Sequence, residues 1–201
     1  MDGNRRWAKS RLLPSFAGHK AGADNIIKII KICIKNNIEF GTFWALSTEN
    51  IKSRSDDELK YLFGLLDKMP SFLKEMLDFG VKFETIGDLD LLPEKTKNIL
   101  LKLKFDSKNN SNFTFILAVG YGGRNEIIRG IKKFINFGGD LEKLDEKSFL
   151  QYLDTGIFPE PDLLIRTGGD IRLSGFMQYV SDYSEYYFNE KKWPEFDENE
   201  L

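Results

Sequence analysis

The hydrophobic pattern of the chain alternates between helical and extended periods. Residues 19–36 carry isoleucines at 26, 27, 29 and 30, a spacing that predicts a largely buried helix. Residues 55–79 also follow a helical pattern. We expect Pro70 to divide or kink it, because proline removes a backbone hydrogen bond and clashes with the preceding turn. Further helices are expected at residues 93–103, which Pro93 opens, at 124–138 and at 146–153.

Short apolar runs between these helices predict strands. They are rich in Phe, Val and Ile, and residues 104–111 read as a polar loop. Repeated alternation of strand and helix predicts an α/β fold whose mainly parallel central sheet is flanked by helices. The chain has no internal repeat and no interdomain linker, so residues 1–201 are expected to form a single domain. The strands are expected at residues 39–47, 81–86, 112–119 and 162–165.

Polar clusters follow three of the predicted strands, at residues 47–50, 120–124 and 166–170. Ligands of parallel sheets bind beyond the carboxyl ends of the strands, so the clusters predict one common site. The sequence GYGGR at 120–124 lacks the spacing of a Walker loop or a dinucleotide fingerprint and does not favour nucleotide binding.

Composition narrows the classes of partner and compartment. Lys and Arg number 29 against 31 Asp and Glu, so no overall basic field attracts nucleic acid, and anions must be bound by local arginines. Cys33 is the only cysteine, which excludes an internal disulfide and fits a reducing cytoplasm. No run approaches the roughly 20 apolar residues of a membrane helix, although peripheral contact with a bilayer stays open. The 17 phenylalanines fit either a Phe-rich core or an apolar channel.

The N-terminal sequence DGNRRW is the first candidate for chemistry. Arginine binds phosphate through a planar fork of donors, and glycine lets the backbone approach an oxyanion. A neighbouring aspartate can hold Mg²⁺, which usually bridges few carboxylates to substrate phosphates. The alternative is a solvated, disordered terminus. The candidates are Asp2, Gly3, Asn4, Arg5, Arg6 and Trp7.

Further candidates lie elsewhere along the chain. Arg166, Arg172 and Ser174 follow a predicted strand and could clamp a diphosphate, or the arginines could simply pair with Asp170. Glu185 stands among aromatic residues, where a buried carboxylate would need a metal or an arginine, unless it lies on an exposed strand face.

The only histidine, His19, begins a predicted helix. Helix N-termini bind anions, so His19 could face a phosphate, although a lone histidine is usually incidental.

Together these segments resemble the cis-prenyltransferase family. The matching stretches occur in the family's order and span almost the whole chain, which makes the set far more specific than any one motif. They are MDGNRRWAK from Met1, AGHKAG from Ala17, STEN from Ser47, YGGRNEI from Tyr121, DLLIRTGGD from Asp162, RLSGF from Arg172, SEYYF from Ser184 and WPEFDE from Trp193.

The resemblance implies an activity, a cofactor and a set of site residues. The expected reaction condenses farnesyl diphosphate with successive isopentenyl diphosphates into a long cis-polyprenyl diphosphate such as undecaprenyl diphosphate, a cell-wall lipid carrier in bacteria. A homodimer is expected, as is an apolar tunnel walled by residues 62–77 and 113–117. By the resemblance, Asp2 is catalytic and holds Mg²⁺ together with Glu185, and Asn50 assists proton removal. The site of the allylic diphosphate is implied to consist of Gly3, Asn4, Arg5, Arg6, Trp7 and His19. Isopentenyl diphosphate is implied to be held by Arg166, Arg172, Leu173 and Ser174, and between the two sites lie Ser47, Thr48 and Glu49.

The chain departs from the family pattern at several points. The family usually has arginine where Ser15 stands, tryptophan at Ile51 and arginine at or near Ser53, and we expect Arg11 or Arg54 to compensate. Asp170 replaces a usual glutamate. The family also has an apolar strand before the first motif and a basic segment after the last, so a fragment is expected.

The same residues also allow four other classes of protein to be weighed against a catalytic cis-prenyltransferase. A non-catalytic subunit of a heteromeric cis-prenyltransferase would lack the acid and arginines of residues 2–6, which are present here. A phosphohydrolase with Asp2 as nucleophile would need a second acid where Asn4 stands. A plain α/β binding domain would leave the motif set to coincidence. The trans-type synthases need DDxxD motifs, which the pair at residues 56–57 does not form.

Overall fold

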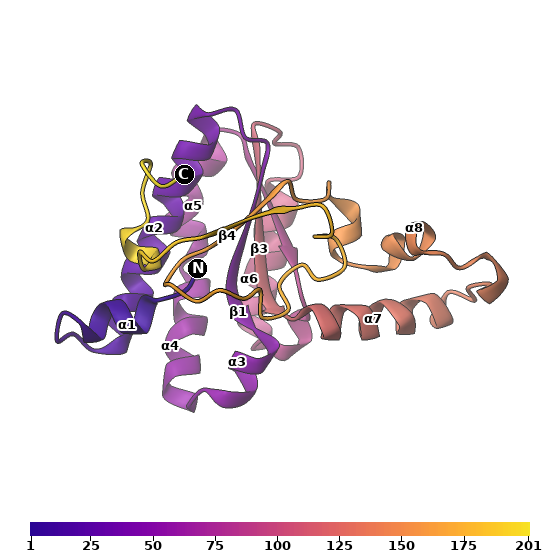
Figure 1. Ribbon diagram of the computed structural model, residues 1–201, viewed down its shortest axis with the longest axis horizontal. Helices are drawn as coiled ribbons and strands as arrows, with labels where there is room; N and C mark the ends of the chain where they lie inside the picture. Colours follow the sequence, from indigo (N-terminus) through magenta and orange to yellow (C-terminus); the bar gives the residue numbers. More distant parts are fainter.

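The computed structural model describes all residues 1–201 and contains two small parallel sheets. In the larger sheet β3 lies between β1 and β2, and the smaller sheet pairs β4 with β5. Figure 1 shows the larger sheet nearly edge-on, with α2 on one side and α7 projecting on the other. The strands are β1 (Phe40–Ser47), β2 (Val81–Ile86), β3 (Phe113–Tyr121), β4 (Leu163–Arg166) and β5 (Glu185–Phe188).

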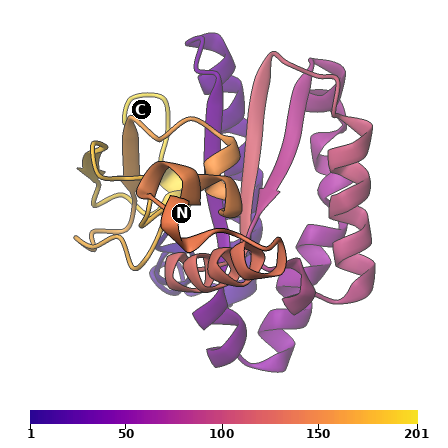
Figure 2. The ribbon, with the colours of Figure 1, turned by 90° about the vertical axis from the view of Figure 1, so that its right-hand side faces the viewer.

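Helices connect the strands and cover the sheet (Figure 2). The α-helices are α1 (Asn4–Lys9), α2 (Ser15–Lys35), α3 (Thr48–Ser53), α4 (Asp56–Asp67), α5 (Met69–Asp78), α6 (Glu94–Asp106), α7 (Gly123–Asn136) and α8 (Glu146–Phe149). The short 3₁₀ turns are η1 (Leu89–Leu91), η2 (Leu141–Lys143), η3 (Leu150–Tyr152), η4 (Thr155–Ile157) and η5 (Trp193–Glu195).

The structure confirms the predicted α/β class with its parallel sheet and corrects some details. The helical segment broken near Pro70 is indeed two helices, α4 and α5. The polar loop expected at 104–111 was wrong in part, because α6 continues to Asp106. The six-residue helices α1 and α3 and the four-residue strand β5 were not predicted as elements, since so few residues show no clear period.

The central strand β3 separates two apolar layers. All nine of its residues are buried, which is why its sequence is a continuous apolar run rather than an alternating one. Phe113, Phe115 and Leu117 face the main core, to which α2, α4, α5 and α6 contribute. Ile116 and Ala118 face a smaller cluster on the other side. The sheet is therefore packed against apolar side chains on both faces, which fixes the position of the carboxyl ends of its strands.

A gap separates the two sheets. β1 and β4 each have one unpaired edge, and a cavity of about 1600 Å³ lies between them. Every residue of β1 and of β4 lines this cavity. At 3.2–3.4 Å per residue, the eight residues of β1 make the gap roughly 26 Å long. Its polar end, where both strands finish, contains the candidate site.

No helix in the structure is both long enough and apolar enough to cross a membrane.

Candidate active site

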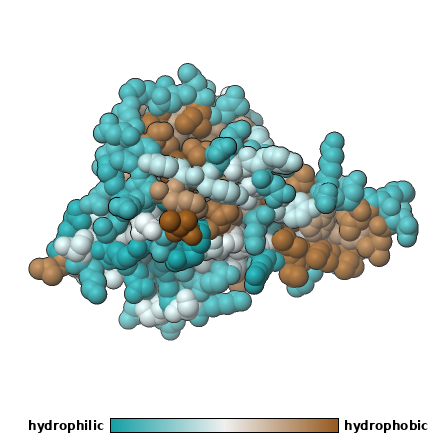
Figure 3. Space-filling view, in the orientation of Figure 1, coloured by the Kyte–Doolittle hydropathy of each residue, from teal (hydrophilic) through white to brown (hydrophobic).

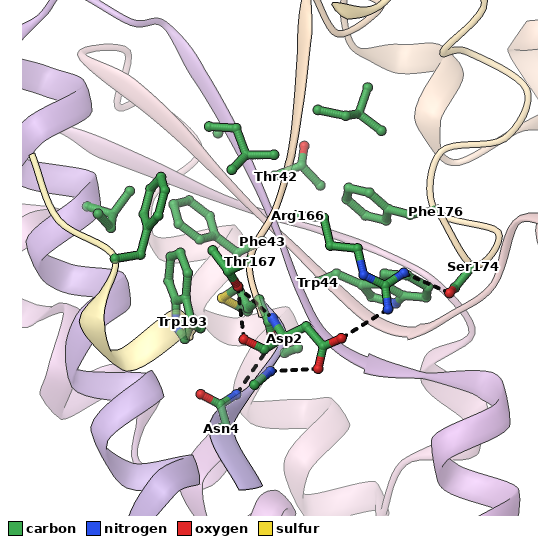
Figure 4. Close-up of a pocket in the computed structure, with 18 of the residues that line it drawn as sticks. Asp2, Asn4, Thr42, Phe43, Trp44, Arg166, Thr167, Ser174, Phe176 and Trp193 are labelled. Carbon is green, nitrogen blue, oxygen red and sulfur yellow. Dashed lines mark hydrogen bonds and ion pairs between the residues drawn. The ribbon is translucent and has the colours of Figure 1, made fainter. Parts of the chain in front are cut away.

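The Asp2 carboxylate is held in place by the other end of the chain. Arg166 Nη2 donates a hydrogen bond to Asp2 Oδ2 at 3.0 Å, and the backbone N–H of Gly3 donates to Oδ1 at 2.6 Å. Thr167 brackets the Asp2 backbone, since its hydroxyl accepts from the Asp2 N–H at 3.0 Å and donates to the Asp2 carbonyl at 2.9 Å. Residues 2 and 167 therefore form one rigid unit (Figure 4).

Three guanidinium groups surround this unit. Arg6 lies 3.4 Å from Asp2 Oδ2 and also donates to the Gly168 carbonyl at 2.7 Å. Asp170 accepts from Arg6 at 3.1 Å and from Arg172 at 3.0 Å, so the pairing of Arg172 with Asp170 that the sequence left open is present. Arg166 further donates to the Ser174 hydroxyl at 2.8 Å. The cluster contains three cations and two carboxylates, which leaves a net positive charge for an anion.

The arginines keep Asp2 ionised. Burial of the carboxyl would raise its pKa, but the hydrogen bonds from Arg166 and Gly3 and the charges of Arg166 and Arg6 outweigh burial. The net effect lowers the pKa of Asp2 below its ordinary value of 3.8. At neutral pH Asp2 is therefore a carboxylate, the form in which it can bind a cation.

A second network surrounds His19, which also lines the cavity. His19 Nε2 lies 3.0 Å from Glu58 Oε1, and the same oxygen accepts from Arg54 Nη1 at 2.8 Å. Arg54 Nη2 donates to the Asn50 side-chain oxygen at 3.3 Å, while the Asn50 backbone N–H donates to Ser47 Oγ at 3.0 Å. Glu58 thus ties the start of α4 to α2 and indirectly positions Asn50.

His19 is neutral at physiological pH. Burial lowers the pKa of its imidazole below the ordinary 6.5, and the nearby Arg54 and Arg5 charges act in the same direction. The hydrogen bond to Glu58 raises the pKa but does not reverse the shift.

The three polar clusters at the strand ends do converge. Gly122 packs against Thr48, because a Cβ at Gly122 would lie 2.5 Å from Thr48 Oγ1. The Gly123 N–H donates to the Gly175 carbonyl at 2.9 Å, which joins the end of β3 to the loop after β4. The segments are therefore adjacent, but only the clusters at 47–50 and 166–170 contribute residues to the cavity; residues 120–124 do not line it, so the prediction of one common site was wrong for that cluster.

Aromatic residues form one wall beside the arginines. The Trp44 ring stacks on Phe176 with centroids 4.9 Å apart, and Tyr121 packs edge-on against both rings. Trp44 and Phe176 line the cavity close to Arg166 and Ser174 (Figure 4). An anion-binding cluster thus borders an apolar surface, an arrangement suited to a ligand with a phosphate head and a hydrocarbon tail.

Comparison with known proteins decides the family. Residues 1–201 match the model of the family described as "Putative undecaprenyl diphosphate synthase". The chain belongs to the cis-prenyltransferase family. It is 40% identical over 206 residues to an isoprenyl transferase of Staphylococcus saprophyticus, an alignment that covers all of this chain and 81% of the relative. It is also 40% identical to the ditrans,polycis-undecaprenyl-diphosphate synthase ((2E,6E)-farnesyl-diphosphate specific) of Micrococcus luteus. That alignment covers all of this chain and 82% of the relative.

Solved structures of the family agree with the fold. Lavandulyl diphosphate synthase from Lavandula x intermedia, in complex with dimethylallyl diphosphate, superposes with a TM-score of 0.94 at 37% identity. All of this chain and 89% of that one are covered. A "probable undecaprenyl diphosphate synthase" from Campylobacter jejuni gives 0.76 at 33% identity, covering 90% of this chain and 85% of the other.

Most of the residues predicted by resemblance to the cis-prenyltransferases lie at the cavity, and three do not. Trp7 is turned away from it, with its ring covered by the Arg11 guanidinium at 4.5 Å. Thr48 is buried and does not line the cavity. Glu185 is exposed on β5, paired with Leu163 and so three residues from the Arg166 end of the sheet. The predicted residues that line the cavity are Asp2, Gly3, Asn4, Arg5, Arg6, His19, Ser47, Glu49, Asn50, Arg166, Arg172, Leu173 and Ser174.

The structure adds site residues that sequence reasoning missed. Glu58 joins His19 to Arg54, and only its spacing of four from Arg54 hinted at this. Thr167 fixes Asp2 from within the RTGGD motif. Of the two arginines expected to compensate for the departures, Arg54 lines the cavity, whereas Arg11 pairs with Glu195 at 2.6 Å and points away.

A second, small cavity lies where the apolar tunnel was predicted. It measures about 80 Å³, the share of liquid volume of two or three water molecules. Fourteen of its 17 lining residues are hydrophobic, and it adjoins the site through Asn4 and His19. The tunnel itself stays a prediction. The apolar residues from the predicted walls that line this cavity are Leu62, Leu65, Leu66, Met69, Phe72, Leu73 and Leu117.

Proposed function

We propose that the chain condenses farnesyl diphosphate with successive isopentenyl diphosphates into a long cis-polyprenyl diphosphate, with undecaprenyl diphosphate as the product. The observation that carries this proposal is the contact of Asp2 with Arg166 inside a cluster of arginines, in a cavity that the aromatic side chains of Trp44 and Phe176 also line. The printed name of the Micrococcus relative supports the choice of substrate and product.

The arginines would act on the departing diphosphate. Leaving-group departure builds negative charge on the allylic diphosphate, and cations fixed beforehand stabilise that charge more in the transition state than in the ground state. Arg6 is anchored to Gly168 and Asp170, so its guanidinium does not have to be ordered during the reaction. The Arg5 side chain is 62% exposed, and its ion pair with Glu58 is a loose one at 4.0 Å. Arg5 could therefore turn toward the same diphosphate.

Magnesium is proposed as the cofactor. No three His, Cys, Asp or Glu side chains converge as a complete metal cage. Mg²⁺ instead usually takes one or two carboxylates and fills its shell with water and substrate phosphates, and the ionised Asp2 fits that pattern. Bound there, Mg²⁺ would neutralise diphosphate charge. Glu185 lies outside this cavity, so its proposed role as a second ligand requires a rearrangement or a partner subunit.

The second substrate would occupy the other side of the cluster. Arg172, Ser174 and Arg166 face the position proposed for isopentenyl diphosphate, and Arg166 would touch both diphosphate sites. The isopentenyl double bond forms the new C–C bond as the allylic C–O bond breaks, and a proton is then lost. We assign assistance in proton removal to Asn50, which Arg54 holds through its side-chain oxygen.

The growing chain is proposed to enter the small cavity between α2, α4 and α5. Each buried CH₂ contributes about 0.8 kcal/mol to the binding free energy. Burial of a prenyl tail would therefore favour displacement of the side chains that line the small cavity. As the cavity measures only about 80 Å³, α4 and α5 must move apart to admit a long product.

One assay tests the proposal. The purified protein is incubated with farnesyl diphosphate, labelled isopentenyl diphosphate and Mg²⁺, and the products are sized by chromatography. We expect products that grow in steps of five carbons, a stop on addition of chelator and recovery with excess magnesium. Hydrolysis of the substrates without any new C–C bond would refute the proposal.

A short-chain product is the second candidate. The TM-score of 0.94 to lavandulyl diphosphate synthase and the small volume of the apolar cavity favour it. Product sizing separates the two, because a short-chain synthase would stop after one condensation.

We also propose that an extended apolar strand fills the gap between β1 and β4. Both facing edges carry unpaired backbone groups along their whole length, which is the template for one more strand. The expected family strand before the first motif would fit there. Slow amide hydrogen exchange along both edges would support this arrangement, and fast exchange would refute it.

A homodimer is proposed through the exposed face of α7. Ile128, Ile131 and Ile135 follow helical spacing and are 53%, 42% and 66% exposed, with Phe137 beyond them. Such a face needs an apolar partner. A cytoplasmic location and a role in supplying a cell-wall lipid carrier are proposed together with this function.

A further inference from the structure

Asn25 is a polar residue among the buried side chains of α2. Its side chain is 3% exposed, and its amide nitrogen donates to two backbone carbonyls, that of Trp193 at 2.7 Å and that of Phe196 at 2.9 Å. These acceptors lie 168 and 171 positions further along the chain. Asn25 itself lines neither the large cavity nor the small one. It therefore fastens a distant segment to α2 without touching the candidate site.

The segment that Asn25 fastens runs along the site, and we call its residues 189–193 the strap. The Trp193 N–H at the end of the strap donates to the Asp2 carbonyl at 2.9 Å. Two residues earlier, the Lys191 carbonyl accepts from the Gly168 N–H at 2.7 Å. The strap therefore bridges the N-terminal motif and the loop after β4, the same two segments that the contact of Asp2 with Arg166 joins.

The strap also packs closely against the turn formed by Asp2 and Gly3. Gly3 has a φ of +97°, in the left-handed region that favours glycine, and a Cβ there would lie 2.9 Å from the Cβ of Lys192. In this conformation the Gly3 N–H donates to Asp2 Oδ1 at 2.6 Å. The Asp2 carbonyl has two donors, the Thr167 hydroxyl and the Trp193 N–H. A shift of the strap would remove one donor and the surface against which Gly3 is packed.

Asn25 holds the strap at its junction with η5. The two carbonyls that it binds belong to the first residue of that short turn, Trp193, and to the residue just after it, Phe196. The Trp193 indole N–H adds a hydrogen bond to the Gly22 carbonyl at 2.7 Å. A buried amide with two acceptors resists displacement, because any shift leaves a buried donor without a partner. The asparagine thus sets the distance between α2 and the strap.

We propose that Asn25 is a positioning residue, which holds the turn of Asp2 and Gly3 in its binding geometry through the strap. The inference rests on the function proposed above, in which this turn binds the allylic diphosphate. Arg172 and Ser174, which are assigned to isopentenyl diphosphate, are held by Asp170 and Arg166 and not by the strap. Loss of the Asn25 amide should therefore weaken the use of farnesyl diphosphate and spare that of isopentenyl diphosphate.

The first test replaces Asn25 with leucine, which has a similar size but no donor. Steady-state elongation is measured with each substrate varied in turn. We expect Asn25→Leu to raise the KM for farnesyl diphosphate about ten-fold and to change the KM for isopentenyl diphosphate less than about two-fold. Asn25→Ser, which keeps one hydroxyl donor, should raise the KM for farnesyl diphosphate about three-fold. It gives a second reading if the leucine variant folds poorly.

A second readout needs no substrate. Hydrogen exchange of the Trp193 backbone amide is followed by NMR in the free protein. We expect exchange in Asn25→Leu to be about ten-fold faster than in the parent, because the strap would open away from Asp2 more often.

Asn110 offers a matched control. Its side-chain nitrogen likewise donates to two carbonyls, that of Leu77 at 3.0 Å and that of Val81 at 2.9 Å, but at the amino end of β2 and away from the site. Asn110→Leu should lower the midpoint of urea unfolding, as Asn25→Leu does. It should leave both KM values and the exchange of the Trp193 amide unchanged.

The proposed dimer does not complicate this test. Figure 1 places the yellow segment that contains η5 beside α2, on the opposite side of the view from α7. Figure 3 shows hydrophobic residues gathered at the α7 end of the same face. The replacement of Asn25 is therefore remote from the surface proposed to pair.

Several results would overturn the inference. They are an unchanged KM for farnesyl diphosphate in Asn25→Leu, an equal rise in both KM values, unchanged exchange of the Trp193 amide, or the same KM rise in Asn110→Leu. Each of these leaves elongation by the parent protein intact, so the proposed function would stand. A parent protein that forms no elongated product would instead overturn the proposed function and, with it, the role of Asn25 in substrate use.

Discussion

Arg166 donates a hydrogen bond to Asp2 across 164 positions of the sequence, at 3.0 Å. This pair joins the N-terminal motif to the loop after β4. The arginine side chain is 16% exposed and the aspartate 38%, so solvent reaches the carboxylate while the guanidinium is largely enclosed. An anion or cation entering the cavity would therefore meet a preformed charged pair.

Asp2→Asn should lower the rate of elongation about 10²–10³-fold, the usual loss when one electrostatic group of a transition state is removed. The amide keeps the shape of the carboxylate but cannot hold Mg²⁺ through a negative charge. Single-turnover elongation with labelled isopentenyl diphosphate measures the loss, and circular dichroism checks the fold. Asp24→Asn, on the exposed surface of α2, is the matched control. Elongation at the parental rate by Asp2→Asn protein would remove Asp2 from the reaction.

The pKa of His19 can be measured directly, because it is the only histidine. Its imidazole proton signal in NMR should titrate below pH 6.5. Since the pKa is lowered on folding, the unfolded chain binds more protons in acid. The contribution of His19 to stability is therefore complete above pH 6.5 and is lost as the pH falls below that value.

Glu58→Gln should lower the pKa of His19 further, because the hydrogen bond and charge of Glu58 raise it. The same NMR titration measures this. A His19 pKa that rises in the variant would contradict the proposed network.

Gly18→Ala should destabilise the fold by about 1–3 kcal/mol. A Cβ at Gly18 would overlap the backbone carbonyl of Asn4, so α1 could not pack on α2. Gly64→Ala is the control within α4, where nothing lies within 4 Å of the added atom. It should stabilise by about 0.5–1 kcal/mol through helix propensity. Urea unfolding of both variants gives the comparison, and equal shifts would refute the close packing of α1.

Arg172→Ala should raise the KM for isopentenyl diphosphate about ten- to hundred-fold and change kcat less, because a charge-assisted hydrogen bond to the substrate is lost. The side chain is 60% exposed and pairs only with Asp170, so the fold should tolerate the change. Steady-state kinetics with each substrate varied in turn measures the effect. Lys102→Ala, on the exposed surface of α6, should leave both constants unchanged. An unaltered KM in Arg172→Ala would exclude Arg172 from that substrate site.

Ile135→Glu should shift the protein from dimer to monomer in light scattering, since it places a charge in the apolar face of α7. Leu101→Glu, on α6 and 42% exposed, is the control and should not alter the mass. A parental protein that is monomeric at all concentrations would refute the proposed dimer.

The sequence predicted local features better than contacts between distant segments. The apolar run of β3 and the break near Pro70 follow from properties of neighbouring residues, and both were correct. The bracket of Thr167 around Asp2 depends on two segments 165 positions apart, which no local pattern contains. The link from His19 through Glu58 to Arg54 was missed for a related reason, because an Arg–Glu pair four residues apart is usually only a surface ion pair.

Glu185 shows the opposite case. Its aromatic neighbours left two alternatives open, an enclosed carboxylate with a metal or an arginine as partner and an exposed strand face, and the four-residue strand β5 turns the carboxylate to the solvent. Which face of a short edge strand is covered depends on the packing of other segments, which the alternation of residues alone does not determine.

The central place of β3 has a consequence for biosynthesis. β1 and β2 hydrogen-bond only to β3, which follows them in the chain, so both strands wait without a partner until residue 121 has left the ribosome. Asp2 gains its hydrogen-bond partners later still, because they are Arg166, Thr167 and the backbone N–H of Trp193. The nascent chain therefore carries β1 and β2 without their hydrogen-bond partner until β3 has emerged, and unpaired strand edges of this kind make a chain prone to aggregation. Its reaction centre is the last part to assemble.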